Sequence, residues 1–261
     1  MSLKSEVKIN LKIKLERVPR MRGFKVSILP NSTVVVRLGK SENLSRVHGF
    51  IDSNQAWLKK CLEKTIFIQS QYPQLSFIEG EAYRFLGENY FLKYEKTDGK
   101  FGVEIKKPYL ILKVPTKIWK DDFAKYPHPQ FRKNILKFYQ EAAERVLPKR
   151  VKELAEITGL KPTKVSLRKQ RTLWGSCSPS GSIQLNWKLI SAPINVIDYV
   201  VIHELAHLKH PNHSKRFWNE VAIFCPDYKQ LKLWLKKHYY SFDHLNETSE
   251  LHSTKWKSDL R

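Results

Sequence analysis

The segment that decides the fold is Val201-Ile202-His203-Glu204-Leu205-Ala206-His207-Leu208, followed by Lys209-His210-Pro211-Asn212-His213. Its run of apolar residues predicts a largely buried helix. On a helix, side chains four positions apart lie on the same face, so His203 and His207 can both direct an imidazole at one ion. Glu204 lies beside that ion, where its carboxylate can take a proton from a metal-bound water. The HExxH pattern therefore predicts a hydrolytic zinc site.

A catalytic zinc takes three protein ligands and a water, so the motif needs a third side chain. His210 and His213 are the candidates. On a straight helix His210 would lie about 10 Å from His203, too far for both to bond one ion at about 2.1 Å. Pro211 disfavours helical geometry at His210 and so ends the helix there.

The chain then turns, and His213 can fold back toward the first two histidines. Ser214 is placed to cap a following helix over residues 215–224, which would fix this turn. We therefore predict His203, His207 and His213 as the metal ligands and Glu204 as the catalytic base. His210 is expected beside the site or on the surface.

Metzincins share this histidine spacing. In that group the eighth position of the motif is glycine, and a methionine turn follows downstream. Here the eighth position is His210, and the only methionines are Met1 and Met21. The sequence therefore argues against a metzincin.

Composition describes a folded chain with excess positive charge. Of its 261 residues, 41% are hydrophobic and 12% aromatic, and 47 Lys and Arg against 25 Asp and Glu give a net charge of +22. Such a field attracts polyanions, so DNA or RNA is a candidate partner of the basic surface. A lysine-rich surface that serves only solubility is the other interpretation.

The cellular compartment is predicted from what the sequence contains. Residues 1–10 alternate charged and apolar side chains, without the apolar core of a signal peptide, and no apolar run approaches the length of a membrane span. The three cysteines are widely scattered, unlike a secreted disulfide framework. We expect a cytoplasmic protein with no membrane partner.

The pattern of apolar residues divides the chain into a β-rich part and a helical part. Strands are predicted over 6–17, over 24–29 and 33–38, and within 77–114. The strands over 24–29 and 33–38 are expected to pair as a hairpin around the turn residues 30–32, a hairpin turn is also expected at 97–100, and a helical region is expected over 43–65. After the prolines at 127 and 129, the expected helices cover 131–147, 148–158, a segment from 193 that includes the motif, 215–224 and 228–239. Short strands are expected at 164–167 and 182–187.

These elements predict an α+β protein. We expect a β-rich basic region over 1–128, a helical zincin-like metallopeptidase domain with a small sheet over 129–240, and a polar tail over 241–261. The boundary at 128 rests on the two closely spaced prolines.

Substrate-binding residues are less constrained by the sequence. Arg171, Trp174 and Asn186 flank the motif helix and could line a cleft, although Trp174 could equally be a core residue. The strand at 182–187 could pair with an extended substrate, or be an ordinary sheet strand.

Several short motifs together resemble the YgjP-like metallopeptidase family, which is similar to the SprT-like and WLM zinc peptidases. They are Trp174-Gly175-Ser176-Cys177, Gln184-Leu185-Asn186-Trp187, the segment from Val200 to His207, and Pro211-Asn212-His213-Ser214 with Phe217-Trp218. The resemblance covers nearly the whole chain. It implies a zinc peptidase in which His203, His207 and His213 are the ligands and Glu204 is the catalytic glutamate. Some relatives cut proteins crosslinked to DNA, which suggests nucleic-acid-associated substrates here.

Two alternatives to a peptidase remain open at this stage. Some members of the family carry a nucleotide pyrophosphatase label, so a zinc-dependent nucleotide hydrolase is one alternative. A basic nucleic-acid-binding module with a non-catalytic zinc is the other. Three histidines with an adjacent glutamate favour an open catalytic site, because structural zinc usually has four protein ligands.

Overall fold

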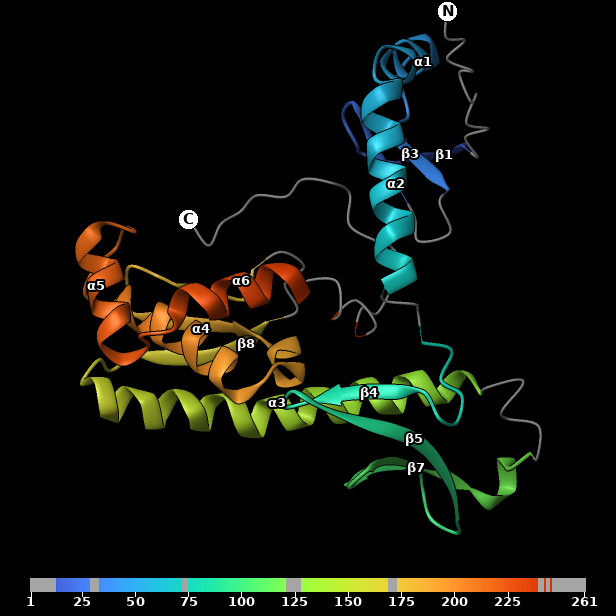
Figure 1. Cartoon of the computed structure of the whole chain (residues 1–261). Helices are drawn as coiled ribbons and strands as arrows, with labels where there is room; N and C mark the ends of the chain where they lie inside the picture. Colours follow the sequence, from blue (N-terminus) through green and yellow to red (C-terminus); the bar gives the residue numbers. More distant parts are fainter. Residues whose placement is uncertain are drawn as a thin grey trace, which may run out of the picture. The chain divides into compact units, whose positions relative to one another are not determined.

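The computed structural model describes residues 13–28, 33–71, 75–120, 128–168, 173–238, 242 and 245 (Figure 1). The chain divides into two compact units. Unit 1 comprises Met1–Gln74 with Asn246–Trp256, and unit 2 comprises Leu75–Leu245 with Lys257–Arg261. Strands prevail in the N-terminal half and helices with a small sheet follow, which confirms the α+β class. Among the described helices, none combines the length and apolar character needed to cross a membrane.

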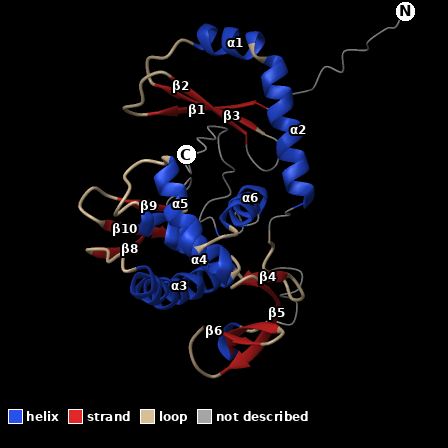
Figure 2. Cartoon of the chain, turned by 60° about the vertical axis from the view of Figure 1, so that its left-hand side comes forward, coloured by secondary structure: helices blue, strands red, loops and turns tan. Residues whose placement is uncertain are grey.

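Unit 1 is a three-stranded sheet with two helices (Figure 2). Its elements are β1 (Ile13–Val18), β2 (Phe24–Ile28), β3 (Val34–Gly39), α1 (Leu44–Ser53) and α2 (Gln55–Gln71). The central strand β3 pairs with β1 in parallel and with β2 in antiparallel, which confirms the predicted pairing of the second and third strands. The helical region predicted over 43–65 is two helices, separated at Asn54.

A small core of its own supports unit 1. Residues of the sheet and of both helices form it: Ile28, Val34, Val36, Val47, Ile51, Leu58, Cys61 and Leu62. The apolar face of the sheet therefore has its own helical cover.

Unit 2 opens with a four-stranded sheet whose strand order differs from the predicted hairpin. Its strands are β4 (Ala82–Phe85), β5 (Glu88–Thr97), β6 (Gly102–Lys106) and β7 (Tyr109–Pro115), in the order β4-β5-β7-β6. The turn at 97–100 joins β5 to β6, but these strands both pair with β7 and not with each other, so the hairpin prediction was wrong. β7 takes the centre because Leu110, Leu112 and Val114 are fully buried, and turn residues alone do not select a partner strand.

The helix α3 (Pro129–Thr158) is the longest element of unit 2. Two helices separated at Pro148 were predicted, and this was wrong: Pro148 lies inside one continuous helix. Leu147 and Val151 on either side are fully buried, so packing on the core offsets the hydrogen bond that proline cannot donate. The predicted end is confirmed, since Gly159 follows in the left-handed conformation with φ 71°.

The second sheet of unit 2 is small. It contains β8 (Lys164–Arg168), β9 (Gly175–Cys177) and β10 (Ser182–Asn186) in the order β8-β10-β9. Of the two interpretations of residues 182–187, the ordinary sheet strand is correct and pairing with a substrate was wrong. β10 is the central strand, and its two edges already pair with β8 and β9.

Three helices complete unit 2. They are α4 (Ile194–Ala206), α5 (Lys215–Phe224) and α6 (Tyr228–His238), and α4 packs against α3, α5 and α6 (Figures 1 and 2). Arg150 of α3 makes a two-pronged ion pair with Asp198 of α4, at 2.5 Å and 2.7 Å. This pair fixes the motif helix on the long helix.

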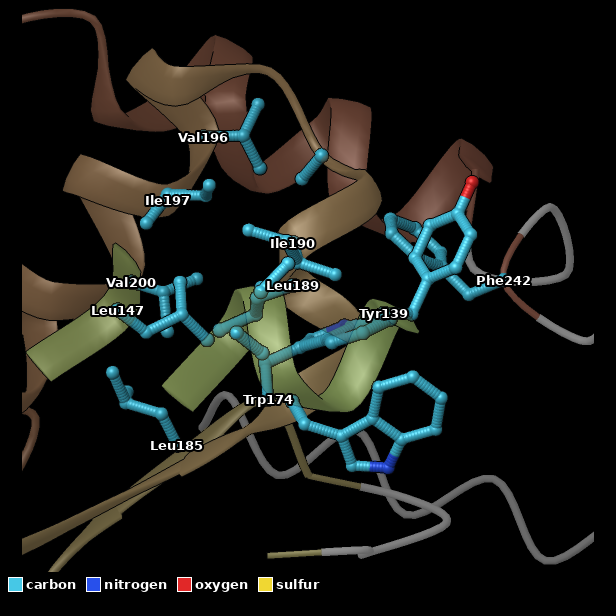
Figure 3. Close-up of a cluster of buried hydrophobic side chains, with 14 of the residues drawn as sticks. Tyr139, Leu147, Trp174, Leu185, Leu189, Ile190, Val196, Ile197, Val200 and Phe242 are labelled. Carbon is cyan, nitrogen blue, oxygen red and sulfur yellow. The ribbon is translucent and has the colours of Figure 1, made fainter. Parts of the chain in front are cut away.

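One continuous core joins both sheets of unit 2 to α3 and α4. Figure 3 shows its centre, where Leu185, Leu189, Ile190, Val196, Ile197 and Val200 surround Leu147 and Tyr139 of α3. The hydroxyl of Tyr139 donates to the carbonyl oxygen of Arg84 in β4 at 2.9 Å. The amide of Leu86 donates to the carbonyl oxygen of Ile190 in the short helix η2 (Trp187–Ser191) at 2.8 Å.

These contacts explain why the structure divides at residue 74 and not at the predicted boundary of 128. The β4–β7 sheet buries its apolar side in the core that α3 and α4 share. Pro129 marks the start of a helix, because it is the first residue of α3 and His128 is the N-cap.

Candidate metal centre

The motif helix α4 and the residue that follows it supply the first three side chains of the site, His203, Glu204 and His207. The helix is apolar on nearly every side, and His203 and Glu204 are each 2% exposed. The helix ends at Ala206, yet the next residue, His207, keeps helical dihedral angles of φ −66° and ψ −20°. His203 and His207 therefore stay one turn apart on one face, with ring centroids separated by 5.0 Å.

His213 returns to this face from the start of α5. Its ring lies 4.6 Å from that of His207 and 5.0 Å from that of His203. The predicted cap is present, because the Ser214 hydroxyl accepts a hydrogen bond from the amide of Phe217 at 3.4 Å. One ligand-type nitrogen from each histidine lies within 4.8 Å of the others.

The backbone carbonyl of His210 forms a hydrogen bond with the candidate ligand His207. Nδ1 of His207 lies 3.1 Å from the carbonyl oxygen of His210. A carbonyl only accepts, so Nδ1 carries the proton and Nε2 keeps a free lone pair. The side chain of His210 instead faces Glu220, with its Nε2 atom 3.6 Å from Oε2 of the glutamate.

Burial keeps the three imidazoles neutral. It lowers the pKa of His203 well below its ordinary value of 6.5, and the other two rings lower it further. Burial also lowers the pKa of His207, and it lowers that of His213 to about 4. Neutral imidazole is the form that binds a metal ion.

Glu204 is a buried carboxyl whose pKa is shifted by burial alone. Burial raises its pKa to about 8, and among the described residues no side chain or amide forms a hydrogen bond with it. Strand β9 lies directly against it: a Cβ atom on Gly175 would lie 2.5 Å from Oε1 of Glu204. Only glycine at position 175 leaves room for the glutamate as it stands.

The geometry and the donor set fit a divalent metal ion. Two nitrogens bonded to one tetrahedral zinc at about 2.1 Å lie about 3.4 Å apart. The Nε2 atoms of His203 and His213 are 3.1 Å apart. An ion there would also favour the charged form of Glu204, which burial alone disfavours.

Two of the three predicted substrate-binding residues, Trp174 and Asn186, take part in the fold. Trp174 is 8% exposed, and its ring lies 4.5 Å from that of Phe242 (Figure 3). Asn186 accepts from the amide of Lys188 and donates to the carbonyl oxygen of Leu173, both at 3.1 Å. Arg171 lies outside the described residues. A substrate role for any of the three stays a prediction.

Two residues next to the histidines were missed by sequence reasoning. The ring of Trp218 lies 5.7 Å from the rings of both His203 and His213 and stacks on Tyr228 at 5.1 Å. Nζ of Lys232 lies over the Trp218 ring, 4.6 Å from its centroid. For Trp218 the sequence did contain a signal, the adjacent aromatic pair Phe217-Trp218. Lys232 reaches the site only through the packing of α6 on α4, which no local pattern reveals.

One protein family matches most of this chain. The family model described as YgjP-like, metallopeptidase domain, matches residues 22–238. The crystal structure of the metallopeptidase zymogen of Pyrococcus abyssi abylysin is similar at 26% identity, over 35% of this chain and 94% of that chain. Its TM-score of 0.32 is too low to imply a shared overall fold. A comparison with curated proteins finds no match. The match to the family model spans most of the sequence, so the chain belongs to the YgjP-like metallopeptidases, metal-dependent hydrolases that act on peptides or proteins.

Proposed function

We propose that the chain is a zinc-dependent peptidase in which His203, His207 and His213 bind the metal and Glu204 is the general base. One observation carries this proposal. Nitrogens of three neutral imidazoles converge within 4.8 Å of one another, and the neighbouring residue is a buried carboxyl. Three histidines suit a catalytic rather than a structural zinc, because one coordination position is left open.

The proposed chemistry assigns each proton. Bound zinc lowers the pKa of a water toward about 7 and polarises a carbonyl group. Glu204 accepts the proton from the attacking water as the new C–O bond forms at the scissile carbonyl carbon. It then passes that proton to the leaving amine as the C–N bond breaks.

The substrate main chain is proposed to lie along β9. This strand pairs with β10 on one side only, and no described strand occupies its other edge. Gly175 of β9 also adjoins Glu204, so a peptide added at this edge would pass beside the base. Main-chain pairing of this kind tolerates many side chains.

Nucleic-acid-associated proteins are the proposed substrates. The support is the net charge of +22, which attracts polyanions in a salt-dependent manner. If the basic surface binds DNA, affinity for a random-sequence duplex will fall steeply between 50 and 200 mM salt. Micromolar or tighter binding with an affinity that does not change with salt concentration would contradict this role.

The decisive assay is cleavage of unfolded protein and peptide mixtures by zinc-loaded wild type and Glu204→Gln. We expect cleavage by the wild type, its loss on chelation, and a fall of at least about a hundredfold in the variant with zinc retained. Full activity in zinc-loaded Glu204→Gln would rule out the assigned base. Release of phosphate from nucleoside triphosphates that depends on Glu204, without peptide cleavage, would favour a nucleotide hydrolase.

A further inference from the structure

Lys232 is an unusual charge for its position. It projects from α6 and is partly buried, and burial lowers the pKa of its ammonium. Among the described residues, no carboxylate forms an ion pair with it. Its resolved partner is the face of Trp218, with Nζ 4.6 Å from the ring centroid. A cation–π contact of this kind orients an ammonium without neutralising it.

Trp218 connects this charge to the histidine cluster. The indole lies 5.7 Å from the ring of His213, tilted by 31°, and is held from below by stacking on Tyr228 with an interplanar angle of 17°. Lys232 is therefore separated from a proposed metal ligand by one side chain. Its positive charge is also felt at both His203 and His213, where it helps lower the pKa.

A positive charge here opposes the metal that the site is built to hold. Like charges in a partly desolvated site repel, and salt in the surrounding water screens that repulsion poorly. Glu204, the carboxyl of the site, has no hydrogen bond with Lys232 and is itself buried. The charge becomes favourable when a substrate carboxylate lies beside Lys232, because the two opposite charges then form an ion pair.

We propose that Lys232, presented by Trp218, is a specificity residue that binds a carboxylate of the peptide substrate. An extended peptide advances about 3.3 Å per residue, so this carboxylate belongs to a residue within about three positions of the scissile bond. Its source is either an acidic side chain or a free C-terminus. The inference rests on the proposed peptidase function.

The test uses pairs of peptides that differ by one charge. Each pair carries Glu or Gln at one position within three residues of the bond that the wild type cleaves, and a further pair ends in a free or an amidated C-terminus. The proteins are zinc-loaded wild type, Lys232→Gln, Lys232→Arg and Lys237→Gln. Lys237 is an exposed lysine of the same helix, so its variant controls for net charge.

We expect the wild type to prefer the carboxylate member of one pair by about tenfold in kcat/KM. That ratio should fall to near one in Lys232→Gln and persist in Lys232→Arg and Lys237→Gln. The pair that responds identifies the source: a Glu/Gln pair shows an acidic side chain, and the C-terminal pair shows a free carboxylate.

The proposal would be overturned if Lys232→Gln lowered kcat/KM equally for both peptides of every pair. The lysine would then support the fold, or act on every substrate alike. Absence of any carboxylate preference in the wild type would overturn it too. Zinc content and circular dichroism of each variant show whether the site is intact.

A binding measurement separates this inference from the peptidase proposal. Zinc-loaded Glu204→Gln should bind the Glu peptide about tenfold more tightly than the Gln peptide, and the double variant with Lys232→Gln should bind both alike. If this preference is found but the wild type cleaves neither peptide, the peptidase proposal fails and the subsite stands. If the wild type cleaves both equally and Glu204→Gln binds both equally, only the subsite fails.

Discussion

At the scale of single residues, Glu204 is a carboxyl whose burial opposes folding of unit 2. A carboxyl that is 2% exposed and has no hydrogen bond within the described chain destabilises the fold when it ionises. Functional sites are where such groups are retained, because a raised pKa suits a group that must both take and return a proton. The sequence placed Glu204 beside the histidines. Its degree of burial depends on β9 and could not be foreseen.

This burial makes a prediction about the stability of the metal-free protein. The pKa of Glu204 is about 8 in the folded state, against an ordinary value of 4.5. The contribution of the protonated carboxyl to the free energy of unfolding is therefore fully present below pH 4.5 and is lost as pH rises through 8. Between these values the unfolded chain has released a proton that the folded chain still holds. We expect Glu204→Gln to gain stability relative to wild type by roughly 1.4 kcal/mol per pH unit across this window.

Urea unfolding of both proteins with a chelator, at pH 5 and pH 8, measures this difference. The histidines whose pKa burial lowers are common to both proteins and act in the opposite direction, so they cancel in the comparison. A difference between the two proteins that does not change with pH would show that Glu204 ionises normally.

Gly175 gives a second prediction at this scale. A Cβ at this position would lie 2.5 Å from Oε1 and 2.6 Å from Cγ of Glu204, so Gly175→Ala must displace the glutamate. We expect peptide cleavage to fall by about a hundredfold, as for other displacements of about 1 Å at a catalytic group, with zinc retained.

Gly102→Ala is the matched control. Gly102 also lies in a strand, and a Cβ there meets nothing closer than 3.9 Å. Its activity should stay within about twofold of wild type. Unchanged cleavage in Gly175→Ala would mean that Glu204 tolerates another position, contrary to its assignment as the base.

At the scale of elements, the turn between α4 and α5 decides the ligand set. α4 ends at Ala206, and Ser214 starts α5 by accepting the amide hydrogen of Phe217. His213 is the residue before that cap, so the direction in which α5 begins sets the position of its imidazole.

We therefore expect Ser214→Ala to destabilise the protein by about 1 kcal/mol and to weaken zinc binding by about tenfold. Competition with a chromogenic chelator measures the affinity. Asn43→Ala removes the corresponding cap of α1, where Oδ1 accepts from the amide of Ser45 at 2.9 Å. It should lose comparable stability without any change in zinc affinity. Equal zinc affinity in Ser214→Ala and wild type would mean that the cap does not position His213.

The elements also show which features a sequence can predict. Gly159 and Ser214 were predicted correctly as the residues that end α3 and cap α5, because capping depends on one or two neighbouring residues. Pro129 was interpreted as part of a domain boundary, whereas it is the first residue of α3. The hairpin at 97–100 and the break at Pro148 were wrong because strand partners and tolerated prolines depend on distant packing. For the same reason the sequence did not show that β10 is the central strand, which is why substrate pairing is proposed for β9 instead.

At the scale of the whole molecule, the chain is two compact units, and the histidine cluster belongs to unit 2 alone. The predicted order of a β-rich half and a helical half was correct, but the β4–β7 sheet packs with the helical half. Periodicity revealed the strands, whereas their membership of a core depends on contacts such as that of Tyr139 with β4, across 55 positions of sequence. The site residues were accessible from sequence because the histidines and Glu204 lie within eleven consecutive residues, from 203 to 213.

The most direct test of the account is the zinc content of purified wild type, His213→Ala and His210→Ala after metal-replete expression. We expect about one zinc per chain in the wild type and in His210→Ala, because position 210 contributes its backbone carbonyl, which alanine retains. His213→Ala should lose stoichiometric zinc. A wild type without zinc, or loss of zinc in His210→Ala alone, would contradict the assigned centre.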